Sequence, residues 1–150
     1  MKVEPLELQY GALKIVVRPL SQLEYLPYAA MFDRFRVFLA GIPEPPKKLK
    51  KEEKEQWRYA WFLKTFVQFV QTMNDVEKEL MYELVATSIQ EWNLKDEKDD
   101  KIADINIQNV KRLPGQVFAN IFWYTYWLNH IMEPDLVFFE TKQEVSQKQQ

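Results

Sequence analysis

The residue types that carry out covalent and metal chemistry are nearly missing from this sequence. Its 150 residues include no cysteine and a single histidine, His130. Disulfides, cysteine-ligated zinc or iron–sulfur sites and a cysteine nucleophile are therefore excluded. His130 stands near the end of an apolar segment that reads as a helix, and an imidazole at a helix end usually has a structural role. No carboxylate stands four residues before or after it, so we expect no catalytic site built on it.

Two further kinds of ligand site fail on their spacing. The chain has only three glycines and no glycine-rich phosphate-binding or nucleophile motif. The acidic loop that begins at Asp96 invites a calcium interpretation. An EF-hand loop starting there needs oxygen ligands at its third and twelfth positions and glycine at its sixth, but these positions hold Lys98, Ile107 and Lys101. We therefore expect no metal, no cofactor and no enzyme activity.

Tryptophans are the remaining candidates for function, as binding groups rather than reactive ones. At about 100° per residue, Trp57 and Trp61 fall nearly opposite the main apolar face of their helix, beside Lys64. Trp123 and Trp127 belong to a later helix that is apolar nearly all round, which is demanding to bury within one chain of this length. Because tryptophan and tyrosine dominate interface hot spots, these four tryptophans are the candidate partner-binding residues.

Each tryptophan pair has a second interpretation. Another part of the chain could cover Trp57 and Trp61, and the last helix could be the central helix of the core. Other aromatic residues of the helix that carries Trp57 and Trp61 fall on one arc and are expected to be core; they are Tyr59, Phe62, Phe66 and Phe69, with Val67 on the same arc. Trp92 is expected to be a packed anchor at a helix end.

The elements that must position these residues begin with a hairpin. Residues 3–18 contain two short apolar strands around Gly11-Ala12, where glycine supplies the backbone freedom of a tight turn. Ser21 and Glu24 have the spacing of a helix capping box. A two-stranded hairpin is only marginally stable by itself, so it must lie on helices or on another chain.

Apolar periodicity and stop signals predict four longer helices after the hairpin. They run from near Pro27 to Gly41, over Lys51–Met73, over Val76–Trp92 with Val76 on the apolar face, and from Pro114 to about Met132. A proline- and lysine-rich connector, Ile42–Lys50, separates the first two, and a charged loop, Asn93–Asp104, precedes a short turn and the last helix.

The predicted fold is mainly α, with an N-terminal β-hairpin followed by an approximately four-helix, bundle-like domain. We expect one domain over residues 1–139 and a polar tail over 140–150. The longest apolar stretch, Val117–Met132, is shorter than the roughly 20 residues that a membrane span needs, and Met1–Tyr10 does not resemble a signal peptide. From these two features we expect no membrane partner and a cytoplasmic location. The net charge is −2 and the pI about 5.6, so we also expect no nucleic-acid partner.

Two segments carry a resemblance to a known family. Trp92-Asn93-Leu94-Lys95-Asp96-Glu97, followed by Asn109-Val110-Lys111-Arg112-Leu113-Pro114, resembles a signature of the tail assembly chaperones of long-tailed bacteriophages. The hairpin with Val17-Arg18-Pro19-Leu20-Ser21 and Glu24-Tyr25 is similar to the start of that family. Together these segments cover about half of the chain. They form a packing and capping pattern rather than a chemical site.

The resemblance implies a non-enzymatic protein that binds the tape-measure protein and helps recruit tail-tube subunits in the host cytoplasm. Binding of this type lays a helix into an apolar groove, and a homo-oligomer is possible. Two other hypotheses stay open. The chain could be a small phage regulator that inhibits a host enzyme such as RNA polymerase, or a virion connector or tail-completion subunit.

Overall fold

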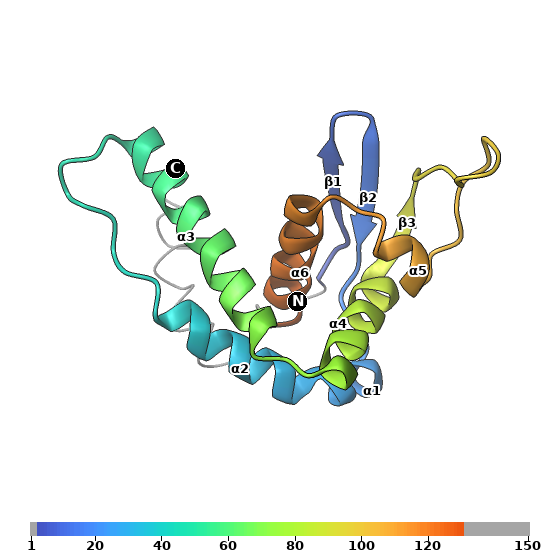
Figure 1. Ribbon diagram of the computed structural model, residues 1–150, viewed down its shortest axis with the longest axis horizontal. Coiled ribbons are helices and arrows are strands. Elements are labelled where there is room, and N and C mark those ends of the chain that lie inside the picture. Colours follow the sequence, from blue (N-terminus) through green and yellow to red (C-terminus); the bar gives the residue numbers. More distant parts are fainter. Residues whose placement is uncertain (1–2, 131–150) are drawn as a thin grey trace.

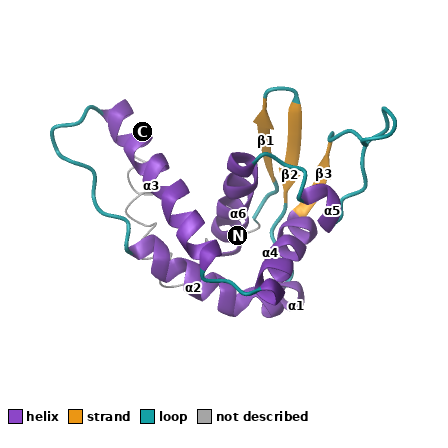
Figure 2. Ribbon diagram, in the orientation of Figure 1, coloured by secondary structure: helices purple, strands orange, loops and turns teal. Residues whose placement is uncertain are grey.

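A three-stranded antiparallel sheet and several helices pack around the helix Gly115–His130 (Figure 1). The computed structural model describes residues 3–130. The elements in chain order are β1 (Leu6–Tyr10), β2 (Leu13–Val17), α1 (Gln22–Tyr25), a 3-10 turn (Leu26–Tyr28), α2 (Ala29–Ala40), α3 (Lys51–Gln71), α4 (Asp75–Ser88), β3 (Ile89–Trp92), α5 (Ile107–Val110) and α6 (Gly115–His130). Figure 2 shows how helices dominate, so the predicted mainly α fold with an N-terminal hairpin is confirmed. The predicted tail, 140–150, lies outside the described residues.

The predicted hairpin forms through a two-residue turn. Gly11 has a positive φ of 62°. It is the only residue with a positive φ in the described part of the chain. Glycine at the first turn position is the signature of a type II′ turn, whose twist matches that of the flanking strands. The register then places Leu8 opposite Ile15, and both side chains are buried. The sheet thus turns one apolar face toward the helices.

The prediction of one helix over Val76–Trp92 is wrong at its end. Helix α4 stops at Ser88, and Ile89–Trp92 forms β3, which pairs with β2 in the order β1-β2-β3. Val16 lies opposite Glu91 and Val17 opposite Ile89, so Gln90 is an extra residue that bulges out of the ladder. The bulge lets Ile89 and Trp92 both face inward although they are three residues apart. That spacing imitates a helix in the sequence.

Three residues expected in the core are exposed. Val76 is 78% exposed, Val67 53% and Tyr59 39%. The buried faces of α3 and α4 are narrower than the apolar arcs in their sequences, because only Thr65, Phe66 and Phe69 of α3 are fully buried. Tyr59 lies near the start of α3, and its hydroxyl donates a hydrogen bond to Asn120 Oδ1 of α6 (3.1 Å).

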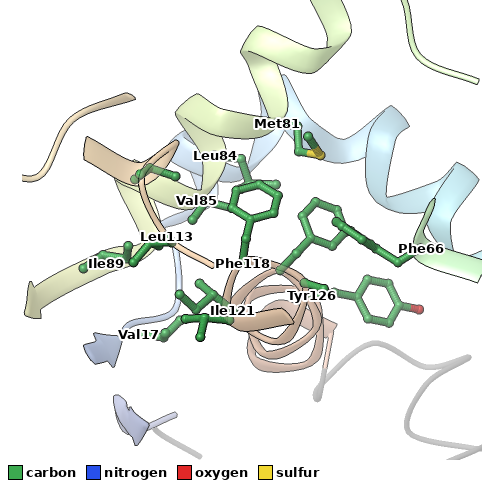
Figure 3. Packing of buried hydrophobic residues seen from close by; sticks show 14 of the residues in the cluster. Val17, Phe66, Met81, Leu84, Val85, Ile89, Leu113, Phe118, Ile121 and Tyr126 are labelled. Carbon is green, nitrogen blue, oxygen red and sulfur yellow. The ribbon is translucent and has the colours of Figure 1, made fainter. Parts of the chain in front are cut away.

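Helix α6 supplies the centre of the core. Figure 3 shows its side chains pointing to different neighbours: Ile121 toward Val17 of β2, and Phe118 toward Leu84 and Val85 of α4. Tyr126 points to the side on which Phe66 of α3 lies (Figure 3). A helix that is apolar on nearly every side is stable only where neighbours cover it on nearly every side. The central-helix interpretation of α6 is therefore correct for most of its surface.

The end of α6 is fixed by polar side chains. His130 is fully buried, with its Nδ1 2.6 Å from the Tyr126 carbonyl oxygen and its Nε2 2.7 Å from the Tyr25 hydroxyl. The Leu20 backbone N–H donates to Asn129 Oδ1 at 2.7 Å. His130 therefore joins the last turn of α6 to α1, which is the structural role expected of it.

The entry to the first helix is held by an ion pair and a capping box. The Ser21 hydroxyl accepts from the Glu24 N–H at 3.3 Å, and the Glu24 carboxylate accepts from the Ser21 N–H at 2.9 Å, so the predicted box is confirmed. The same carboxylate accepts two hydrogen bonds from the Arg18 guanidinium, at 3.0 and 2.8 Å. Chiefly because of Arg18, the pKa of Glu24 falls from 4.5 to about 2.

This pKa predicts a pH-dependent loss of stability. A carboxyl group whose pKa is lowered on folding stabilises the protein above its unfolded pKa, and this contribution is lost as the pH falls through the folded pKa. We expect Glu24→Gln to lower the free energy of unfolding by about 1 kcal/mol or less at pH 7, because the pair is partly exposed. The difference from wild type should shrink between about pH 5 and pH 2.

Urea denaturation at a series of pH values measures this difference. The matched control introduces Glu24→Gln into an Arg18→Met background, where the pH-dependent part should be smaller. An equal dependence in both backgrounds would contradict the assignment to Arg18.

Candidate partner-binding groove

A groove lies between α3 and β1 in the described part of the chain. It has a volume of about 1130 Å³. In Figure 1, α6 lies between α3 and β1, and it contributes side chains to the groove between those two walls. The lining residues come from β1 (Glu7, Leu8, Gln9, Tyr10), the end of α2 and the segment after it (Arg36, Leu39, Ala40, Ile42, Pro43, Glu44, Pro45), α3 (Glu55, Arg58, Tyr59, Phe62) and α6 (Asn120, Trp123, Tyr124, Tyr126, Trp127). The groove is therefore built from segments far apart in the sequence.

Aromatic rings form much of its surface. Trp123 and Trp127 are half-buried and both line the groove. The Trp123 ring packs against Phe62 of α3, with ring centroids 6.0 Å apart, and against Tyr126, at 5.8 Å. These contacts hold the Trp123 side chain in place before any partner arrives. A preorganised aromatic surface loses little side-chain entropy on binding.

Polar atoms at the edges of this surface are mostly bonded within the chain. Arg36 Nε donates to the Tyr126 hydroxyl at 3.2 Å, and the Tyr59 hydroxyl is held by Asn120. Burial raises the pKa of the Tyr10 phenol, although a hydrogen bond with Asn120 opposes this. Tyr10 therefore stays protonated at neutral pH and is not an activated nucleophile.

Exposed charges surround the groove. Glu7, Glu44 and Glu55 line it together with Arg58, and all four residues are exposed. Among residues 3–130 the structure gives no ion pair for any of these four. Their charges are thus available to a partner.

The four predicted tryptophans do not share one surface. Trp57 and Trp61 do not line the groove. They pack on each other, with ring centroids 5.7 Å apart, and Lys64 Nζ lies 4.5 Å from the centre of the Trp61 ring. The Lys64 ammonium makes a cation–π interaction with the Trp61 ring. It therefore covers part of the ring face that a partner would otherwise contact. The structure thus brings Trp123 and Trp127 together and leaves Trp57 and Trp61 apart from them.

Several residues of the groove gave no signal in the sequence. The connector at Ile42–Pro45 has no apolar period and was expected only to be exposed, yet it closes one side of the groove. The edge of β1 lines the groove only because the sheet packs beside α6. A residue such as Arg58 could have been placed there only by knowing how α3 is oriented against α6.

Other features of the described residues give no alternative site. A smaller hollow of about 410 Å³ between α3, α4 and the start of α6 is lined mainly by apolar side chains. Residues 3–130 contain no group of three or more histidine and acidic side chains placed to hold a metal ion. Within the same residues, no helix has both the length and the apolar character to cross a membrane.

No protein-family model, curated protein or solved structure matches this chain.

The separation of the two tryptophan pairs predicts different responses to an apolar dye. We expect Trp123→Ala with Trp127→Ala to reduce the fluorescence of bound bis-ANS by at least about half, because it removes aromatic surface from the groove. Trp57→Ala with Trp61→Ala should leave dye binding nearly unchanged. Circular dichroism checks that both variants stay folded. Equal loss of dye binding in the two variants would contradict the location of the apolar site.

Proposed function

We propose that this protein is a tail assembly chaperone of a long-tailed bacteriophage. It acts without catalysis in the host cytoplasm, binds an apolar segment of the tape-measure protein and aids assembly of the tail tube around it. The observation that carries this proposal is the groove between α3 and β1, an aromatic surface that is rimmed by charge and large enough for a polypeptide segment.

Two of the segments that resemble the chaperone family, Trp92–Glu97 and Asn109–Pro114, are joined to each other in this fold. Trp92 Nε1 donates to the Ala103 carbonyl oxygen at 2.8 Å. Arg112 binds the Lys95 carbonyl oxygen at 2.8 Å, and its Nε lies 3.0 Å from a Glu97 carboxylate oxygen. The Trp-Asn-Leu end of β3, the charged loop and α5 are thereby tied together ahead of α6. This agrees with a signature whose role is packing, and it supports the family proposal through structure rather than chemistry.

Co-expression with the tape-measure protein of the same phage genome tests the proposal. We expect wild type to raise the soluble fraction of that protein several-fold, because an apolar segment held in a groove no longer aggregates. Trp123→Ala with Trp127→Ala should lower the gain. Trp57→Ala with Trp61→Ala should also lower it if those residues form a second contact, as their sequence positions predict.

The control is a catalytically and structurally unrelated small acidic protein expressed at the same level. A tape-measure protein that stays equally insoluble with and without this chain would disprove the chaperone proposal. Placement of the gene among early genes, away from those for the tail tube and tape measure, would favour the regulator instead.

A further inference from the structure

The strand β1 has an open edge whose backbone direction can be worked out from its neighbours. The Asn93 N–H donates to the Lys14 carbonyl oxygen at 3.1 Å, so the backbone groups of Lys14 face β3. Gln9 lies opposite Lys14 in the register. In an antiparallel pair the residues alternate between bonding to each other and pointing away from each other. The backbone N–H and C=O of Gln9, and those of Glu7 two residues before it, therefore point away from β2.

This open edge borders the groove. Four consecutive residues, Glu7–Tyr10, line it. Since successive side chains of a strand point to opposite faces of a sheet, a cavity lined by all four lies along the edge of the strand rather than on one face. Within residues 3–130 and outside the β1–β2 ladder, the backbone groups of Glu7 and Gln9 make no hydrogen bond. Among the described residues, the groove thus has a row of backbone donors and acceptors without partners along β1.

The unpaired edge of β1 favours an extended backbone over a helical one in a ligand that fills the groove. Such a ligand removes water from the Glu7 and Gln9 backbone groups, and a buried polar group without a partner costs about 1–3 kcal/mol. A helix satisfies its own backbone groups and offers none to the strand. An extended segment lies about 4.8 Å from β1 and can bond to each outward group. Its side chains on the α6 side would then meet Tyr124 and Trp127.

The charges on the rim indicate the side chains that the ligand carries. Three exposed carboxylates, those of Glu7, Glu44 and Glu55, lie at the groove without an ion pair among the described residues. Arg58 is the opposing charge, whereas Arg36 is already hydrogen-bonded to Tyr126. Positive groups on the solvent side of an extended segment would complement this rim.

We propose that the groove binds its partner protein through an extended segment of alternating apolar and basic or polar residues, which adds to β1 as a fourth strand. The proposal rests on the proposed function in that the groove is the partner's binding site. It goes further by naming the backbone conformation and charge of the bound segment, and it differs from the helix-in-groove mode that the family resemblance implies. Recognition then has two parts, backbone pairing at β1 and side-chain packing on α6.

A matched pair of variants tests the backbone part. Gln9→Pro removes the outward N–H and blocks pairing at that position, while the bonds between β1 and β2 remain, because proline is tolerated on an edge strand with its nitrogen facing outward. Gln9→Ala removes the same side chain and keeps the N–H. The probe is a fluorescein-labelled peptide, KVTIKVTIK, and the readout is its anisotropy on titration with the full chain. We expect Gln9→Pro to weaken binding by about tenfold or more and Gln9→Ala by about twofold or less.

The peptide itself gives a second test that needs no variant to fold. Two copies are made, each N-methylated at every second residue, in the two alternating frames. An added strand turns one set of amides toward β1 and the other toward solvent. We therefore expect one frame to lose about tenfold or more in affinity and the other about threefold or less. The acidic twin EVTIEVTIE should bind at least about fivefold more weakly than the basic peptide at low salt.

Several results would overturn strand addition. They are equal binding to Gln9→Pro and Gln9→Ala, equal loss in both N-methylated frames, no binding of the unmodified peptide at millimolar concentration, or a bound probe that is helical by isotope-edited infrared spectroscopy. If Gln9→Pro does not fold, the two methylated frames decide alone.

The two proposals fail separately. Rescue of the tape-measure protein by Gln9→Pro and Gln9→Ala alike would overturn strand addition and leave the chaperone function in place. Peptide binding in the expected pattern without any rescue by wild type would support the strand site and disprove the chaperone function.

Discussion

The fold depends on the burial of one aromatic side chain, Phe122, in the middle of α6. Its ring lies within 4.9–6.1 Å of four other phenylalanine rings, measured between centroids. Two of them, Phe32 and Phe35, come from α2, and the other two, Phe66 and Phe69, come from α3. Edge-to-face and tilted aromatic contacts add to the free energy of area burial. Because these five rings join both α2 and α3 to α6, the angle between the helices, and with it the opening of the groove, depends on how the rings pack.

The same constraint explains why a groove remains. Helix α6 is apolar on nearly every side, and within residues 3–130 it is covered by the sheet, by α4, and by the pair α2 and α3. Between β1 and α3 the cover is incomplete, and there the exposed positions of α6 carry Trp123, Tyr124 and Trp127. These amphipathic rings tolerate partial exposure better than leucine or phenylalanine would, because each has a polar atom that water can reach. The tryptophans therefore mark the place where the elements of residues 3–130 leave α6 partly uncovered.

Sequence patterns predicted the elements well and their arrangement poorly. The hairpin, the Ser21–Glu24 capping box and the long helices follow from local signals such as Gly11 at a turn and Pro114 ahead of α6. Strand β3 was missed because its bulge at Gln90 gives Ile89 and Trp92 a helical spacing, and only pairing with β2 reveals it. The candidate site was half predicted. Trp123 and Trp127 could be chosen from composition, whereas the β1 edge and Ile42–Pro45 join them through long-range packing that no local pattern encodes.

An open strand edge beside an apolar groove can pair nonspecifically with strands of other molecules. Two features of β1 limit such pairing. β1 is only five residues long, and Glu7 places a negative charge on the open edge. Short edges and edge charges are the usual means by which sheets avoid pairing with one another. In a second copy that approached edge to edge, Glu7 would bring a like charge to the same strand, which opposes self-association. A basic segment is attracted by the same Glu7 carboxylate that repels a second copy of β1. The feature that keeps the edge free can therefore also select what binds there.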